Sequence, residues 1–309
     1  MGYFMSFFIT LSAVASMLIF TVPAYALVKF KVAKSEHIPV LAAILLYLCT
    51  PSIIINSFLQ LDFSPDTISN LGIYLLLSFL IQFIMMGGVW LIVKKSENKK
   101  NRIAAIASSL GNCGFFGVPL LRALFPQNPE AVIYSALFSI SMNAIAFTFG
   151  SLIISGDKKY IKVKKVFLNP AMIGTFISIP LFILGIDIPD ILGNALASLV
   201  AISTPLCMFV LGMRLATIKL SHIFTNTTAY LTVCAKQLTM PLIAFAITLL
   251  LPLDPMTEAA FIIISSCPVA TVVLNLSELL GEGQKHAADC VLLGTILSIS
   301  TMPIISLLI

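Results

Sequence analysis

Charged residues are scarce in this sequence, and their scarcity excludes a soluble globular protein. Only 10% of the 309 residues are Asp, Glu, Lys or Arg, whereas 59% are hydrophobic and the mean hydropathy is +1.06. Soluble domains usually carry about 25% charged residues. The apolar residues gather in runs long enough to cross a bilayer, so we expect an integral membrane protein embedded in the lipid bilayer.

Catalytic and metal-binding motifs are missing as well. The six cysteines are isolated in apolar segments without metal-ligand spacing, and we expect them to act as small hydrophobic residues. His37, His222 and His286 fall at or just before the start of an apolar run, in the connections, where we expect them to be solvated. With no histidine and no pair of carboxylates inside a run, the sequence predicts neither an enzyme nor a bound cofactor. A G-x-x-x-x-G-K-[ST] loop is also absent, so the chain itself offers no ATP site.

Ten apolar runs of about 20 residues predict ten transmembrane helices. The runs cover residues 4–28, 38–60, 70–93, 103–125, 130–154, 166–186, 190–213, 223–252, 257–280 and 286–309. Nearly all of the 18 basic residues lie in alternate connections between them, which the positive-inside rule places in the cytoplasm. We therefore expect a multi-pass protein of the cell inner (plasma) membrane, with both termini outside. Because topology explains the basic residues, we expect no nucleic-acid partner.

The lysine-rich residues 157–165 divide the ten runs into five and five. An odd number of spans per half turns the second half upside down, which predicts two inverted repeats, 1–156 and 166–309, joined by a cytoplasmic basic linker. Short matches recur in order at a separation of about half the chain. They are Thr50-Pro51 with Thr204-Pro205, Gln82 with Gln237, Pro23 with Pro180, and Ser108-Ser109 with Ser265-Ser266.

The fourth run, "SSLGNCGFFGVPLLRALFP" (108–126), contains residues that interrupt a helix. A glycine costs about 1 kcal/mol and a proline about 3 kcal/mol in a helix interior. Non-helical backbone at membrane depth is tolerated where it is buried in protein or lines a cavity. The ninth run, "SSCPVATVVLNLSELLG" (265–281), has Pro268 at the corresponding place. Two interrupted helices in matching positions predict a substrate site at the midplane. Alternatively, Gly111, Gly114 and Gly117 form a close-packed face between helices.

The two interruptions supply most of the candidate substrate-binding residues. Asn112 can donate and accept hydrogen bonds, which suits a carboxylate or the oxygen shell of a cation. The candidates in the interruptions are Gly111, Asn112, Cys113, Gly114, Pro119, Pro268, Ala270, Thr271 and Asn275.

Two polar residues outside the interruptions are further candidates for the site. Asn143 in the fifth span is the next candidate for the site. Lys236 lies well inside the eighth span, where a buried ammonium is costly and usually functional or paired. Its charge could attract an anion or replace a coupling cation; the alternative is a side chain that extends to the cytoplasmic interface.

The segment "GNCGFFGVPL" resembles the Asn-x-Gly-Phe-x-Gly-x-Pro-Leu signature of the auxin efflux carrier (AEC) family, which includes bacterial malate and malonate permease-like members. "NPAMIG", "TPLCMFVLGMRLA", "KQLTMP" and "CPVATVVLNLSELLG" extend the resemblance along the chain. It implies a ten-helix fold whose fourth and ninth helices break and cross at prolines, as in bile-acid symporters and sodium–proton antiporters. It also implies small organic anions as substrates, and Asn112, Pro119 and Pro268 as residues of the crossover site. Some members have an asparagine where this chain has Val272, so Asn275 is the nearest replacement.

We therefore expect an all-α membrane protein that works as a secondary transporter of a small organic anion by alternating access. The alternatives are a sodium-coupled symporter of a bile-acid-like or other organic solute, and a passive channel or sensor on the same scaffold. Coupling to Na⁺, to H⁺ or to neither is compatible with the sequence, and so is a homodimer.

Overall fold

The computed structural model describes residues 2–61, 64–94, 99–128, 131–157, 159, 168, 170–217 and 225–309. These residues form helices, and their only β-type pairing is one isolated bridge between Gly111 and Val269. The first half contains α1 (Gly2–Ile19), α2 (Thr21–Lys29), η1 (Ser35–His37), α3 (Ile38–Ile44), η2 (Leu45–Cys49), α4 (Thr50–Phe58), α5 (Pro65–Val93), α6 (Lys99–Ala107), η3 (Cys113–Gly117), α7 (Val118–Leu124), α8 (Val132–Ile145), η5 (Ala146–Gly150) and α9 (Ser151–Ser155). The second half contains α11 (Pro170–Leu184), α12 (Asp190–Thr217), α14 (Thr227–Cys234), η7 (Ala235–Thr239), α15 (Met240–Thr248), α16 (Pro255–Ser265), α17 (Thr271–Leu280), α18 (Gln284–Ile305) and η8 (Ser306–Leu308).

Among the described residues, seven helical stretches are long and apolar enough to cross a membrane. They are Phe4–Lys29, Ser35–Phe58, Ile68–Val93, Val132–Ser155, Asp190–Thr217, Thr227–Thr248 and Gln284–Leu308. The predicted fourth, sixth and ninth spans contain shorter apolar helices, Cys113–Leu124, Pro170–Leu184, Pro255–Ser265 and Thr271–Leu280. The chain is therefore a multi-pass, membrane-embedded protein. Except for Asp157 and Lys159, the predicted basic linker 157–165 lies outside the described residues.

Both predicted interruptions are present in the backbone. Helix α6 ends at Ala107 and helical structure resumes at Cys113, while α16 ends at Ser265 and α17 begins at Thr271. Serines at the two helix ends donate to carbonyls of the preceding turn, Ser109 to Ile106 at 2.9 Å and Ser266 to Ile263 at 2.7 Å. These bonds satisfy part of the acceptors that every helix leaves free at its C-terminus.

Among the described residues, four π-helical turns lie within the predicted spans: η2, η3, η5 and η7. Pro51, Pro119 and Pro241 each occupy the second position of the α-helix that follows η2, η3 and η7. A proline has no N–H and its ring clashes with the carbonyl four residues earlier. The wider i→i+5 turn accommodates both defects without ending the helix, and such turns occur frequently at functional sites.

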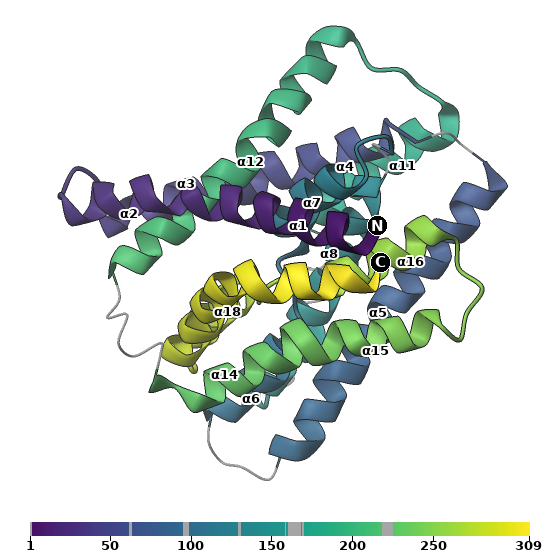
Figure 1. Cartoon of the computed structure of the whole chain (residues 1–309). Coiled ribbons are helices and arrows are strands. Elements are labelled where there is room, and N and C mark those ends of the chain that lie inside the picture. The colour runs from purple at the N-terminus through teal and green to yellow at the C-terminus, as the bar shows by residue number, and fades with distance from the viewer. Residues whose placement is uncertain are drawn as a thin grey trace.

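The helices of the first half pack against those of the second half. Helix α12 packs along α2 and α11 along α4, while α1 lies beside α18, so that both termini lie close together (Figure 1). Within the halves, α5 packs against α8 and α14 against α18. In each of these last two contacts, a glutamine forms a hydrogen bond between the two spans. Gln82 of α5 donates to the Ser141 hydroxyl at 2.7 Å, and Gln237 of η7 donates to the Gly294 carbonyl at 2.7 Å.

Two side-chain expectations have different outcomes. Five of the cysteines are buried and Cys234 is exposed, so most act as small hydrophobic residues. His37 is exposed, and His222 lies outside the described residues. The expectation of a solvated His286 is wrong, because its side chain is buried in the first turn of α18 beside Asn226 and Cys290.

Gly212→Ala tests the close contact between α12 and α2. A Cβ atom at Gly212 would overlap the carbonyl oxygen of Thr21 and lie 3.0 Å from the Ala24 Cβ. Because backbone atoms cannot move aside locally, we expect the free energy of unfolding to fall by about 1–3 kcal/mol, measured as a lower melting temperature in detergent. Gly72→Ala is the matched control, since nothing lies within 4 Å of its added Cβ. Equal melting temperatures for the two variants would contradict the contact.

Candidate functional site

The two interrupted stretches meet and pair with each other through their backbones. The Asn112 N–H donates to the Pro268 carbonyl at 2.6 Å, and the Ala270 N–H donates to the Leu110 carbonyl at 2.9 Å. No water is available inside a bilayer to satisfy such groups, so each stretch supplies the partners that the other needs. The mutual pairing explains how both helices can be interrupted at membrane depth.

Two helix N-termini begin at this contact. The chain re-enters helical structure at Cys113 and at Thr271, and the preceding residues, Asn112 and Ala270, place no side-chain cap on the new helices. The amides in the first turn of a helix carry a partial positive charge and point out of its N-terminus. Such uncapped ends favour a negatively charged group beside them.

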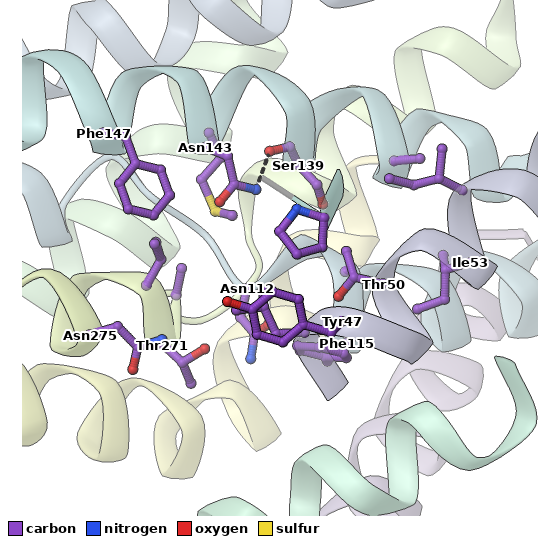
Figure 2. A pocket seen from close by; sticks show the side chains of 18 of the residues that line it. Tyr47, Thr50, Ile53, Asn112, Phe115, Ser139, Asn143, Phe147, Thr271 and Asn275 are labelled. Carbon is purple, nitrogen blue, oxygen red and sulfur yellow. Dashed lines mark hydrogen bonds between the residues drawn. The ribbon is translucent and has the colours of Figure 1, made fainter. Parts of the chain in front are cut away.

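A cavity of about 390 Å³ lies beside the two N-termini (Figure 2). Its apolar wall includes Ile53, Phe115 and Phe147, and Figure 2 shows Asn112 between Phe147 and Asn275 at one end and Ile53 at the other. The polar side chains that line it are Tyr47, Thr50, Asn112, Ser139, Asn143, Thr271 and Asn275. None of the described lining residues is charged, so polarity comes from amides, hydroxyls and the helix ends.

Six of the eleven residues predicted from the sequence line this cavity: Asn112, Gly114, Asn143, Ala270, Thr271 and Asn275. The Asn112 side chain is buried. The amide nitrogen of Asn143 donates to the Ser139 carbonyl at 2.8 Å. The cavity thus brings together residues from both interruptions and from the fifth predicted span.

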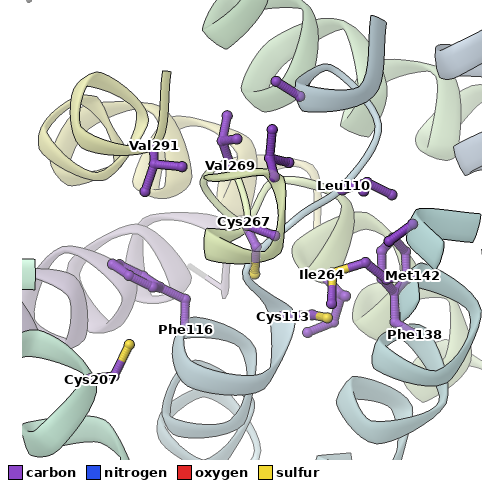
Figure 3. Packing of buried hydrophobic residues seen from close by; sticks show 14 of the residues in the cluster. Leu110, Cys113, Phe116, Phe138, Met142, Cys207, Ile264, Cys267, Val269 and Val291 are labelled. Atoms are coloured by element: carbon purple, nitrogen blue, oxygen red, sulfur yellow. The ribbon is translucent and has the colours of Figure 1, made fainter. Parts of the chain in front are cut away.

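The other five predicted residues lie outside the cavity wall. Gly111 and Pro268 belong to the paired backbone behind it. Cys113 lies among buried hydrophobic residues of α8 and α16, and its thiol contacts the Ser139 hydroxyl at 3.0 Å (Figure 3). Pro119 lines a different cavity, between α1, α7 and α12.

Lys236 is the fifth, and its side chain is completely buried. Its Nζ donates to the Ser265 carbonyl at 2.6 Å, at the end of α16. A Cβ atom at Gly111 would lie 3.0 Å from both Cε and Nζ of Lys236, so the ammonium lies directly against the paired segment. The alternative in which Lys236 extends to the interface is therefore wrong. The positive charge instead faces the negative end of a helix dipole.

Four residues that were not predicted from the sequence also line the cavity: Tyr47, Thr50, Ser139 and Phe147. Thr50 lies beside Pro51, and its hydroxyl donates to the Leu45 carbonyl at 2.9 Å inside η2. The threonine–proline pair within an apolar span is the sequence feature that could have indicated this part of the cavity wall. The other three residues are ordinary for membrane helices, and nothing in their spacing distinguishes them.

Comparisons with known proteins agree with a transport role. A family model described as "Membrane transport protein" matches residues 9–306. A protein of Rhizobium meliloti, provisionally named a malonate transporter, is 24% identical over 72% of this chain and 71% of its own length. An uncharacterized transporter of Methanocaldococcus jannaschii is 24% identical over 94% of this chain and 96% of its own. Another, from Methanothermobacter thermautotrophicus, is 24% identical over 94% and 95%.

Lys236→Met tests whether the buried ammonium stabilises the interrupted helices. The substitution keeps the side-chain length but leaves the Ser265 carbonyl without its donor, and an unsatisfied buried acceptor costs about 1–3 kcal/mol. We therefore expect a lower melting temperature of the purified protein in detergent. Lys94→Met, at an exposed position at the end of α5, is the control and should leave the melting temperature unchanged. An equal or higher melting temperature for Lys236→Met would contradict the stabilising role.

Proposed function

Because the chain belongs to the membrane transport protein family, we propose that it is a secondary carrier that moves a small organic anion through the cavity beside Asn112. The motif resemblance to the auxin efflux carriers is confirmed by this family match, and the chain is a membrane transporter rather than an enzyme. The identity of the substrate and the mechanism are the proposed part.

One observation carries the proposal: the cavity is built where the two interrupted segments meet and their helices restart. A carboxylate at a helix N-terminus gains about 0.3–1 kcal/mol, and up to about 2 kcal/mol when partly buried. Here two such ends, at Cys113 and Thr271, lie beside the same cavity, and the Asn112 amide adds a donor. A cavity of about 390 Å³ is at the lower end of the range for small-molecule sites, which favours a small solute.

Two further observations support an organic acid. The apolar wall around Phe115 and Phe147 suits the carbon skeleton of such a solute. The relative from Rhizobium meliloti carries a name that refers to malonate, a small dicarboxylate. We extend this class of substrate, small carboxylates, to the present chain.

Alternating access is proposed on an architecture of ten spans in two inverted repeats, with the fourth and ninth spans crossing. The contacts between helices support this architecture. When each span in a contacting pair is replaced by the span five places before or after it, the result is another contacting pair. The pair α2 and α12 corresponds in this way to α11 and α4, and the pair α5 and α8 to α14 and α18. The Gln82 and Gln237 hydrogen bonds repeat in the last two pairs. Rocking of one group of helices against the other would expose the cavity to each side in turn.

Orientation in the inner membrane follows from the basic connections, which we place in the cytoplasm together with the lysine-rich linker, leaving both termini outside. In the proposed orientation the cavity extends from Asn112 toward the cytoplasmic ends of the helices, because Leu168 and Leu279 also line it. We also propose that Lys236 supplies the positive charge that a coupling cation would otherwise bring to the paired segments. Binding would then need no Na⁺.

Ligand-induced stabilisation of the purified protein tests the function. Malonate, malate and indole-3-acetate are added in detergent, each with and without Na⁺. A ligand at 100 times its dissociation constant stabilises the fold by roughly 2.7 kcal/mol, which is visible as a rise in melting temperature. We expect a carboxylate to raise it with or without Na⁺, and Asn112→Ala to abolish the rise. Asn194→Ala, at an exposed position of α12, is the control and should keep it.

Each other outcome removes a defined part of the proposal. Stabilisation that requires Na⁺ would contradict the role given to Lys236 but keep the carrier. A response to cationic or neutral solutes alone would overturn the organic-anion class. Normal binding by Asn112→Ala would overturn the placement of the site.

A further inference from the structure

Four β-branched side chains form an apolar layer that is separate from the main hydrophobic core. Ile53 of α4, Val118 of α7, Val132 of α8 and Val200 of α12 pack together, and none is more than 5% exposed. β-branched side chains have few rotamers and therefore make a stiff contact. We call this group the Val118 layer. It joins α4 and α12 to the helices that follow the first interruption.

The Val118 layer lies between two cavities. Ile53 and Val118 line the cavity beside Asn112, whereas Val118 and Val200 line a second cavity of about 330 Å³. The layer contributes no side-chain donor or acceptor, so a carboxylate entering it would lose its hydration without compensation. The contact of these four residues therefore opposes the passage of an anion between the two cavities.

An arginine lines the second cavity. Arg122 lies in the last turn of α7, on the other side of the interruption from the basic connection that precedes this span. Ser16 of α1 and Thr204 of α12 contribute hydroxyl groups to the same cavity. No described carboxylate forms an ion pair with Arg122. Arg122 is exposed, so its guanidinium is accessible to a solute that enters the second cavity. The guanidinium can bind a carboxylate through two parallel hydrogen bonds.

We propose that the second cavity is the outer half of the anion pathway, in which Arg122 binds the substrate carboxylate, and that the Val118 layer is the barrier between this site and the cavity beside Asn112. The proposal rests on the proposed function and on its membrane orientation. Ile53 and Val200 lie on one side of the contact and Val118 and Val132 on the other. Movement of α4 and α12 away from α7 and α8 therefore opens the barrier toward Arg122.

The barrier is tested by thiol labelling, which needs no knowledge of the substrate. A membrane-impermeant methanethiosulfonate reagent is applied to intact cells, with the parent protein as the blank for the native cysteines. Ser16→Cys reports on the second cavity and Ser139→Cys on the first. We expect the Ser16→Cys thiol to react much faster than the Ser139→Cys thiol, which becomes accessible only while the barrier is open. Adding Val118→Ala should expose Ser139→Cys, whereas Val233→Ala, a buried valine outside the layer, should not.

The role of Arg122 is tested by side-resolved transport of radiolabelled malonate. Arg122→Gln should raise the KM for malonate added outside about tenfold, because a charge-assisted hydrogen bond contributes about 1.4 kcal/mol or more. The KM measured from the cytoplasmic side should stay unchanged, and Arg122→Lys should restore part of the outer affinity. A purely structural role would instead lower the amount of folded protein and leave both KM values equal to those of the parent.

Several outcomes would overturn the inference. Labelling of Ser139→Cys as fast as that of Ser16→Cys with the layer intact excludes the barrier, and so does an unchanged labelling rate after Val118→Ala. A Ser16→Cys that reacts only with a membrane-soluble maleimide shows a lipid chain in the second cavity, which excludes the anion site. If no carboxylate binds or is transported but the labelling pattern holds, the proposed function and Arg122 site fail, whereas the barrier stands.

Discussion

The backbone pairing of the two interrupted segments is the contact on which the rest of this structure depends. Separating Asn112 from Pro268 and Ala270 from Leu110 would leave two donors and two acceptors unsatisfied in a buried part of the protein. The pairing allows two helices to stop and restart in the middle of the protein. It thereby places two uncapped N-termini beside one cavity and one helix end beside Lys236. Each half of the chain thus stabilises the irregular segment of the other.

The sequence was sufficient for the class of protein and for the position of both interruptions. Hydropathy, glycine and proline act locally, so the runs and breaks could be read without knowing what packs against them. Asn112 and Thr271 could be predicted as cavity residues for the same reason, because they lie in or directly beside the interruptions that glycine and proline mark. Gln82 and Gln237, which the sequence paired as a possible repeat, each hydrogen-bond a neighbouring helix.

The remainder of the site depends on packing, which no single span encodes. Tyr47 and Ser139 are ordinary residues that become cavity walls because α4 and α8 lie beside the interruptions. Lys236 could not be oriented from the sequence, because a lysine in a span can extend to either interface or remain inside. The Lys236 side chain is held inside the protein by its hydrogen bond to the Ser265 carbonyl, and it fits there because Gly111 has no side chain. Both of these residues belong to other spans. Pro119 was chosen as a helix breaker, yet the break lies before it and its ring lines the second cavity.

The π-helical turns give the cavity an unusual sensitivity to chain length. Three of them carry lining residues, with Tyr47 in η2, Phe115 in η3 and Phe147 in η5, while η7 carries Lys236. Relative to an α-helix, each such turn holds one additional residue. Deleting one residue there would close the turn to α-helical geometry and change the side chain that the turn presents, while the helix beyond it would keep nearly the same orientation, because the wider turn accommodates the extra residue locally. Relatives that differ by a single insertion or deletion at these points would therefore change one part of the cavity wall without any change of fold.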